Sequence, residues 1–395
     1  MPTYQEDGTT SLIKRTQMKT PAYVLDEKLL RDNLQLIRNT AQEAGIEIIL
    51  ALKAFAWWRT FPIFREYIHH TTASSLNEAL LSAEKFGGYT YTYSPSYEEH
   101  NFQEIMRLSE HITFNSLSQF NRFSSFINKY KDHPISCGLR INPELSDIQT
   151  ALYNPCAPGS RFGIIAEDMP NELPQEIEGF HFHCLCENNS DSLKRVLDKV
   201  EKNYAQWLPQ LKWINMGGGH LMTRKGYDLH LLIETLQTFK QRHPNLHIIL
   251  EPGSAFLWQT GWLEAYVTDI IENHNIRTAI INASFTCHMP DCLEMPYHPK
   301  IKEAKHIEET SEMPSNCYRI GGNSCLSGDW MGIWQFDHPL AIGEKIIFED
   351  MIHYTTVKTT MFNGIDHPSL VLRHLDGSRE TLRTFKYADY RERMD

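Results

Sequence analysis

The segment EGFHFHCLCENNSDSLKRVLDKVEKNYAQWLPQLKWINM, residues 178–216, contains the pattern that decides the fold. It begins with a short apolar run over residues 178–184 and ends with another over residues 212–216. Between them, residues 191–207 alternate polar and apolar side chains at helical spacing. A strand, a helix and a second strand in this order are typical of an α/β protein with parallel strands.

Runs of the same kind recur along residues 26–255 and predict eight strands: 46–52, 69–73, 89–94, 112–115, 135–142, 178–184, 212–216 and 246–251. Segments of helical spacing, such as residues 77–84, separate them. Eight such units match a (β/α)8 barrel of the TIM type, which typically has about 250 residues. A doubly wound open sheet is the alternative.

After residue 256 the pattern changes to a period of two residues, which indicates a second, mostly antiparallel β domain. Tyr23–Leu25 is expected to pair with this domain, because the barrel is complete without it. We therefore predict a barrel over residues 26–255 and a β domain made of residues 1–25 plus 256–395. The period-two runs are 262–270, 278–282, 345–348 and 354–361, and the charged tail 376–395 is expected at the surface.

The composition of the 395 residues limits the class of partner. Lys and Arg number 38 against 49 Asp and Glu, a net charge of −11, which argues against a nucleic-acid binder and suits a cationic small molecule. No apolar run approaches the roughly 18 residues that span a bilayer, and we expect no signal peptide. Eight scattered cysteines predict free thiols in a reducing cytoplasm.

Residues able to do chemistry follow several predicted strands, where barrel enzymes carry their active sites. Lys53 interrupts an apolar run, and a buried lysine has a lowered pKa that suits covalent bonding to an aldehyde; a solvated strand-end lysine is the alternative. Gly217–Gly219 could bring backbone N–H groups to a phosphate or form a plain turn. Glu251 could hold a proton on a pyridine nitrogen or be a solvated glutamate.

His181 and His183 point to the same face of their strand. Zinc binding with Cys184 and Cys186 is disfavoured, because four ligands from one short strand would point to opposite faces. A ring stacked on a flat cofactor is favoured over a core histidine. In the second domain, Cys325 and Asp329 could serve proton transfer and amine binding, or form a glycine-rich turn with a buried thiol.

Taken in order, these motifs resemble the fold-type III pyridoxal-phosphate decarboxylases, whose fold is that of alanine racemase. The resemblance extends over residues 20–370 and implies a (β/α)8 barrel with a β domain, and pyridoxal 5'-phosphate as cofactor. The motifs are ALKAF at 51–55, HFHC at 181–184, GGG at 217–219, EPG at 251–253, CLSGD at 325–329, Tyr354 and FNG at 362–364.

Within that group, the chain is most similar to the carboxynorspermidine (carboxyspermidine) decarboxylases, which make norspermidine or spermidine. Ser254 stands where ornithine and diaminopimelate decarboxylases usually have Arg, and Leu326 where the latter have Glu. The strings that carry this similarity are ALKAFAWW at 51–58, TTASSLNEA at 71–79, SRFGI at 160–164, HCLCEN at 183–188, CHMPDCLEMPY at 287–297 and CLSGDW at 325–330.

The resemblance implies a role for each residue of the predicted cofactor site. Lys53 would bond the cofactor aldehyde, Glu251 would keep the ring nitrogen cationic, and His183 would stack on the ring. Racemases of this fold usually place an arginine at the position of Glu251, which favours decarboxylation here. The remaining implied cofactor residues are Gly218, Gly219, Gly253 and Tyr354 at the phosphate, and Arg140 as a brace near Lys53.

The resemblance also implies a homodimer with shared active sites. Cys325 would protonate the substrate across the interface, and Asp329 would bind an ammonium group of a polyamine-type substrate. Asp291 and Glu294 are further candidates for the cationic arm, with surface charge as the alternative. Cys186 stands where diamine decarboxylases often have a phosphate-binding serine, and a thiol is a weaker donor.

Other functions stay open at this point. One is a different decarboxylase of the same fold, acting on diaminopimelate, ornithine or lysine, or a racemase. Another is a non-catalytic cofactor-binding homologue, which is disfavoured because Lys53 and Cys325 are both present.

Overall fold

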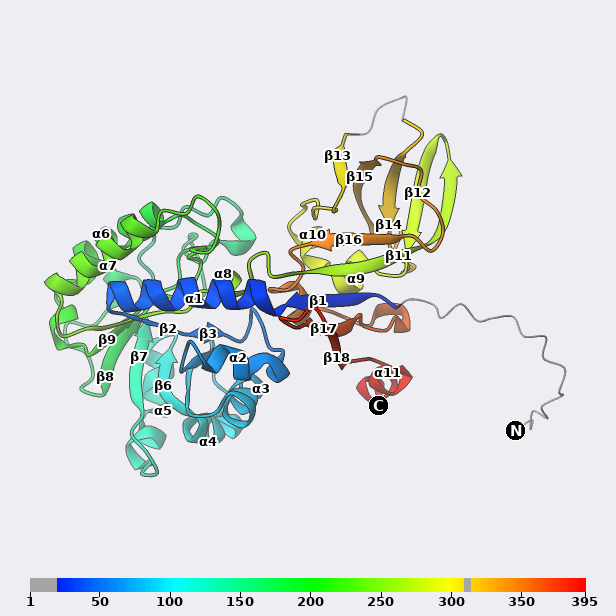
Figure 1. The fold of residues 1–395 in the computed structure, drawn as a ribbon. Coiled ribbons are helices and arrows are strands. Elements are labelled where there is room, and N and C mark those ends of the chain that lie inside the picture. Colours follow the sequence, from blue (N-terminus) through cyan, green and yellow to red (C-terminus); the bar gives the residue numbers. More distant parts are fainter. Residues whose placement is uncertain (1–19, 309–313) are drawn as a thin grey trace.

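Two β-sheets organise residues 20–308 and 314–395, the part of the chain that the computed structural model describes. A parallel sheet lies at the left of Figure 1 and a mixed sheet at the right. Helix α1 (Glu27–Ala44) follows strand β1 (Ala22–Asp26) directly and runs from the mixed sheet across the parallel one. These two elements therefore join the two parts of the molecule.

The parallel sheet closes into a barrel. Its first strand is interrupted at Ile49, so it forms β2 (Glu47–Ile48) and β3 (Leu50–Ala51). The last strand pairs with β2, and β3 pairs with β4, which closes the ring. The predicted eight-strand barrel is confirmed. The other strands are β4 (Thr71–Ala73), β5 (Thr90–Tyr93), β6 (Ser109–Phe114), β7 (Ser136–Arg140), β8 (Ile177–His181), β9 (Trp213–Asn215) and β10 (His247–Leu250).

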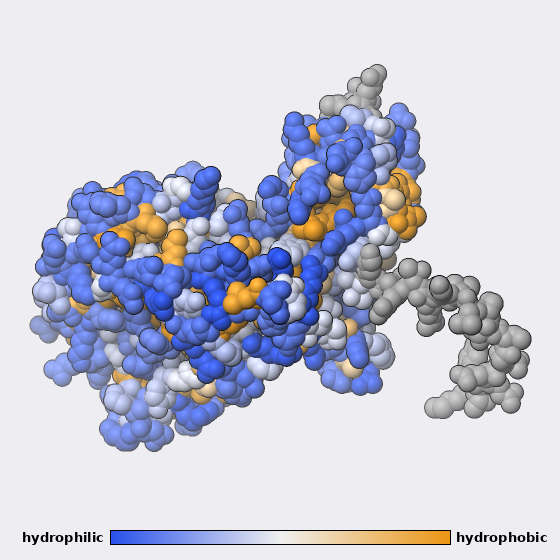
Figure 2. Space-filling model, in the orientation of Figure 1, coloured by the Kyte–Doolittle hydropathy of each residue, from blue (hydrophilic) through white to orange (hydrophobic). Residues whose placement is uncertain are grey.

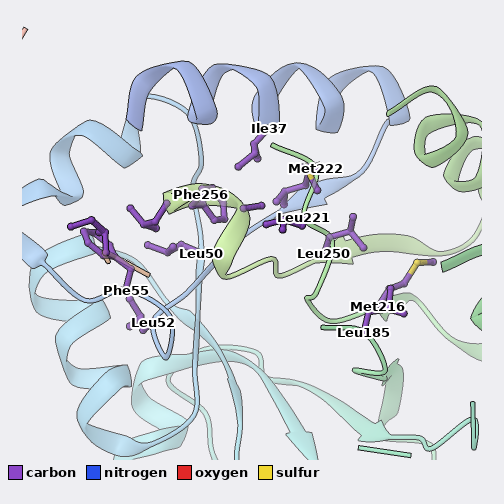
Figure 3. Packing of buried hydrophobic residues seen from close by; sticks show 14 of the residues in the cluster. Ile37, Leu50, Leu52, Phe55, Leu185, Met216, Leu221, Met222, Leu250 and Phe256 are labelled. Atoms are coloured by element: carbon purple, nitrogen blue, oxygen red, sulfur yellow. The ribbon is translucent and has the colours of Figure 1, made fainter. Parts of the chain in front are cut away.

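Helices cover the outside of the barrel, and α1 shows how they are anchored. The Asp26 side chain accepts the Leu29 N–H at the first turn, and Gly45, with φ of 65°, ends the helix. Ile37 projects from α1 toward Phe256 in the apolar layer of Figure 3. The other helices on the barrel are α2 (Phe61–Arg65), α3 (Leu76–Leu81), α4 (Glu99–Leu108), α5 (Leu117–Lys129), α6 (Ser190–Tyr204), α7 (Leu229–Arg242) and α8 (Ser254–Leu257).

The inside of the barrel is unusually polar and aromatic. Barrel interiors are normally filled by Val, Ile and Leu. Here the ring of His111 stacks on that of Tyr91, with the ring centroids 4.0 Å apart. It also stacks on the ring of Trp213, with the centroids 4.8 Å apart. Hydroxyl groups of Thr72 and Thr113 line the same interior. The barrel can therefore hold polar groups beneath its mouth.

The mixed sheet has the order β13-β15-β14-β12-β11-β1-β17-β18, with β16 also pairing with β11. Most pairs are antiparallel, as predicted, and β1–β17 and β12–β14 are parallel. Tyr23–Leu25 pairs with this sheet, which confirms its predicted place. The strands are β11 (Gly261–Asn273), β12 (Ile276–Ile281), β13 (Ala304–Ile307), β14 (Cys317–Gly321), β15 (Trp330–Phe336), β16 (Lys345–Glu349), β17 (Ser369–Arg373) and β18 (Arg379–Arg383).

One predicted strand is wrong. Residues 354–361 contain a 3-10 helix, Thr355–Val357, because Tyr354 turns the backbone with φ of 52° and donates its N–H to Ala54 O.

The tail 376–395 holds β18 and helix α11 (Tyr387–Met394), both largely exposed. Short helices α9 (Phe285–His288) and α10 (Pro290–Glu294) follow β12.

The surface in Figure 2 is mainly hydrophilic, with separate apolar patches. None of the described helices is both long and apolar enough to cross a membrane. The division into domains at residues 25/26 and 255/256 stays a prediction.

Candidate active site

A cavity of about 1300 Å³ opens where the carboxyl ends of the barrel strands face the mixed sheet. Lys53 and His183 line it from the barrel. Asp291 and Tyr354 line it from the other side. Segments far apart in the chain thus meet at one mouth, as barrel topology requires.

Glu251 lies at the carboxyl end of β10 and is only 5% exposed. Asn215 donates its side-chain amide to Oε2 at 3.2 Å, and His181 Nε2 lies 3.3 Å from Oε1. Burial alone would raise the pKa of Glu251, but His181 and Lys53 lower it below its usual range. The site therefore holds an ionised carboxylate. Asn215 escaped the sequence analysis, although a polar residue inside the apolar run before Gly217 was a signal for it.

His183 is oriented by the glycine turn. The Gly218 N–H donates to His183 Nδ1 at 2.9 Å, which leaves the other ring nitrogen to carry the proton of a neutral imidazole. Burial, followed by the positive charges of Lys53 and Arg140, lowers the pKa of His183. A Cβ atom on Gly217 would lie 2.7 Å from the same Nδ1 atom. The glycines thus hold His183 neutral and close to the turn.

Arg140 is buried at the end of β7. Its guanidinium lies 4.7 Å from the ring centre of Tyr93 and 4.4 Å from that of Phe162. One guanidinium nitrogen lies 3.5 Å from the carbonyl oxygen of His183. Arg140 therefore braces the segment after β8 that carries His183.

Gly219 and Gly253 form a part of the wall that carries no side chains. A Cβ on Gly219, where φ is 89°, would lie 2.2 Å from Leu185 C. A Cβ on Gly253 would lie 2.6 Å from Ala54 Cβ, next to Lys53. Both glycines line the cavity, so their backbone can approach a bound group closely.

Asp291 and Glu294 both contact the ammonium group of Lys358. Although burial opposes its charge, these two acids raise the pKa of Lys358 to about 12. Lys358 also lines the cavity, as does Asp291. Lys358 was not predictable from the sequence, since its contacts join positions more than sixty residues apart.

Cys325 and Asp329 are not among the described residues that line this cavity. Cys325 is exposed, and its N–H donates to Asn363 Oδ1 at 2.7 Å. Asp329 is 4% exposed and accepts the N–H groups of Thr286 and Ser324, each at 3.0 Å. A single chain therefore separates these two residues from the mouth that holds Lys53.

Cys186 and Ser254 also line the cavity. Burial raises the pKa of Cys186 to about 11, so its thiol is protonated at neutral pH. Ser254 donates its hydroxyl to Glu187 Oε1 at 3.3 Å. Both positions carry neutral groups at the cavity wall.

The chain is similar in sequence to a known protein family and to several named decarboxylases. The family model described as pyridoxal-dependent decarboxylase, C-terminal sheet domain, matches residues 22–352. A carboxyaminopropylagmatine decarboxylase of Synechocystis sp. is 46% identical over 379 residues, covering 96% of both chains. A carboxynorspermidine/carboxyspermidine decarboxylase of Campylobacter jejuni is 43% identical over 381 residues, covering 95% of this chain and 98% of that one.

Solved structures of decarboxylases are also similar to this chain. A carboxynorspermidine decarboxylase of Campylobacter jejuni complexed with norspermidine superposes with a TM-score of 0.87 at 42% identity, covering 95% of this chain and all of that one. A diaminopimelate decarboxylase of Helicobacter pylori complexed with L-lysine has a TM-score of 0.80 at 17% identity. The second likeness concerns the fold alone, and it confirms the predicted barrel with a second sheet.

Proposed function

Because the chain belongs to the family of pyridoxal-dependent decarboxylases, we propose that it removes CO2 from carboxynorspermidine or carboxyspermidine. The family assignment confirms the predicted resemblance, the activity of a carboxy-lyase and pyridoxal 5'-phosphate as cofactor. The observation that carries the proposal is that Lys53 and His183 line the cavity at the barrel mouth, directly above the buried Glu251, whose pKa both of them lower.

The residues at the mouth fit the cofactor. Lys53 offers an amine for its aldehyde, Glu251 a carboxylate for its ring nitrogen, and His183 a neutral ring for its flat face. At Gly219 and Gly253 a Cβ would collide with neighbouring atoms, so the wall presents backbone there. A backbone wall of this kind suits a phosphate, whose oxygens accept hydrogen bonds from N–H groups.

When bound, the cofactor takes up the electron pair that departing CO2 leaves on the substrate. We propose that Lys53 holds the aldehyde carbon and that Glu251 keeps a proton on the ring nitrogen. His183 then excludes water from one ring face, while Arg140 braces the segment that carries it. Backbone groups at Gly218 and Gly219, with Gly253 and the Tyr354 hydroxyl, complete the phosphate end. In this structure the Gly218 N–H is already engaged with His183, so Gly218 contributes chiefly by orienting that ring.

The substrate end of the site is proposed to lie at α10. Asp291 and Glu294 would hold a cationic nitrogen of the substrate arm, a place that the Lys358 ammonium takes in this structure. Carboxyaminopropylagmatine is a second candidate substrate, because the relative with that name is 46% identical over nearly the whole chain. It ends in a guanidinium, which two carboxylates can bind in bidentate fashion.

A competition experiment tests the proposed reaction. The purified protein with pyridoxal phosphate receives carboxynorspermidine, carboxyspermidine, carboxyaminopropylagmatine, ornithine, lysine and meso-diaminopimelate at equal concentrations. Mass spectrometry then follows each product. We expect one of the first three to be consumed fastest. Faster consumption of any of the last three would overturn the substrate class.

We also propose that the active protein is a homodimer in which Cys325 and Asp329 complete the site of the partner. Leu326 follows the exposed Cys325 and is 45% exposed, Trp330 ends the same motif at 39%, and Phe362, at 47%, precedes the Asn363 that bonds Cys325. Apolar side chains gathered in this way are typical of a protein interface. Cys325 Sγ would then deliver a proton to the substrate carbon, and Asp329 would bind an ammonium group.

Mixing two inactive variants tests the shared site. Lys53→Ala and Cys325→Ala each lack one essential group, but a hybrid dimer of the two contains one intact site. We expect the mixture to regain activity, with a dimeric mass by light scattering. A monomeric mass with full activity would contradict the proposal.

We also propose a cytoplasmic location. All eight cysteines are free in the structure, as expected in a reducing compartment.

A further inference from the structure

A second histidine lies beneath the mouth of the barrel, in contact with Glu251. His181 is 2% exposed, and its Nε2 atom lies 3.3 Å from Glu251 Oε1. Neither of its ring nitrogens makes a hydrogen bond to another described residue. Buried polar atoms are normally hydrogen-bonded, so this ring requires an explanation.

The surroundings of His181 are polar and closely packed. The edge of its ring meets Tyr93, with centroids 5.1 Å apart. A void of about 10 Å³, the size of one water molecule, is lined by His181, Glu251 and Asn215 with neighbouring hydroxyl groups. A water molecule there can satisfy the ring nitrogen that does not face Glu251.

The charge state of His181 follows from its position. Burial lowers the pKa of His181, although Glu251 opposes this effect. The other titratable groups around the pair are Arg140 and Lys53, whose positive charges also disfavour an imidazolium, and His183, which is neutral. His181 is therefore neutral at the pH of the cell, so it does not cancel the charge of Glu251.

We propose that His181 is a positioning residue, whose neutral imidazole together with the Asn215 amide holds the Glu251 carboxylate ionised and in a fixed orientation. This inference rests on the proposed role of Glu251 toward the ring nitrogen. Each carboxylate oxygen then has one neutral neighbour: Asn215 at Oε2 and His181 at Oε1. A neutral polar group in contact with a carboxylate stabilises its ionised form without cancelling the negative charge that faces the cofactor.

Substitution of His181 separates this role from simple space filling. His181→Phe keeps a ring of similar size but removes both nitrogens, while His181→Gln keeps a neutral amide near the position of Nε2. The matched control is His111→Phe, because His111 lines the same void and stacks between Tyr91 and Trp213 away from the mouth.

With the holoenzyme, we expect His181→Phe to lower kcat about tenfold, because Glu251 loses the polar group in contact with Oε1, while KM changes little. Without its neutral partner the buried Glu251 protonates more readily. The acid limb of the kcat profile and the acid transition in the absorbance of the bound cofactor should both move up by about one pH unit. His181→Gln should give intermediate values and His111→Phe the wild-type values.

Thermal unfolding of the cofactor-free protein gives an independent measurement. A buried carboxylate with a lowered pKa stabilises the fold at neutral pH, and this stabilisation is lost as pH falls. In His181→Phe the loss should begin at a higher pH than in wild type. If His181→Phe fails to fold, His181→Gln is compared with wild type in the same way. Curves for the His181 variants that coincide with His111→Phe would overturn the inference. Wild-type protein that does not decarboxylate would instead overturn the proposed function.

Discussion

The hydroxyl of Tyr354 lies so close to Gly253 that a Cβ atom on residue 253 would come within 2.9 Å of it. Tyr354 is itself fixed, because its N–H donates to Ala54 O at 2.8 Å, next to Lys53. The strand end after β10 and the 3-10 helix of the other sheet thus meet at the proposed phosphate end. Whatever displaces one of them displaces the other.

Gly253→Ala should therefore weaken cofactor binding. The new methyl group would meet both Ala54 Cβ and the Tyr354 hydroxyl at less than van der Waals distance, so the wall must shift. We expect the dissociation constant of pyridoxal phosphate to rise about tenfold, as measured by fluorescence titration of the cofactor-free protein. Unchanged affinity in Gly253→Ala would contradict the proposed place of the phosphate.

Lys53→Ala should abolish covalent attachment of the cofactor. Lys53 lines the cavity with His183, and no other amine is expected to replace it. After borohydride reduction, mass spectrometry should find the cofactor mass on wild type and not on the variant. Lys300→Ala is the matched control, because Lys300 lines the same cavity but pairs with Glu349 at 2.5 Å. Retention of the added mass in Lys53→Ala would exclude the proposed attachment.

The barrel could be predicted from the sequence because its strands are short and mostly buried and alternate regularly with segments of helical spacing. Strands such as β18 could not, since residues 379–383 are largely exposed and carry charged side chains. The run after Tyr354 misled the prediction for a different reason. Thr355–Val357 consists of β-branched residues, which favour a strand. However, the hydrogen bond from the Tyr354 N–H to the Ala54 carbonyl oxygen turns the chain away from the sheet.

Some residues of the candidate site could likewise be predicted from the sequence, and others could not. Lys53, His183 and Glu251 were predictable, because barrel topology brings the carboxyl ends of parallel strands to one mouth. Lys358 was not, since its contact with Asp291 depends on how a loop of the mixed sheet packs against α10. The position of Cys325 relative to a second chain is likewise not contained in local sequence pattern.

Lys358→Met should expose the acids proposed to bind the substrate arm. Without the ammonium group, Asp291 at the cavity wall and its neighbour Glu294 lose the cation that both contact. Norspermidine should then raise the unfolding temperature of the variant more than that of wild type, in a differential scanning experiment at low salt. Lys300→Met removes a charge from the same wall and serves as the control. Equal protection of all three proteins would mean that these acids do not hold the amine.

The opposite end of the barrel holds a carboxylate that joins its closing strands. Glu47, at the start of β2, accepts hydrogen bonds from His70 next to β4 and, at 2.7 Å, from His247 of β10. The Tyr91 hydroxyl donates to it at 3.1 Å. Burial alone would raise the pKa of Glu47, but His247 and His70 lower it, while the bond to Glu47 raises the pKa of His70. These groups therefore stabilise the place where the barrel closes.

Glu47→Gln should lower the free energy of unfolding most between pH 4.5 and 6.5, the ordinary values of the two groups. Because the pKa of folded His70 is raised, its contribution is complete below 6.5 and is lost as pH rises through the folded value. Because the pKa of Glu47 is lowered, its contribution is present above 4.5 and is lost as pH falls. We expect a loss of about 1–3 kcal/mol at pH 5.5 and a smaller one at pH 8.5, from urea unfolding. Asp32→Asn, which breaks the exposed pair with Lys28, should change little at either pH. A loss that is equal at both pH values would mean that His70 is not charged in the folded protein.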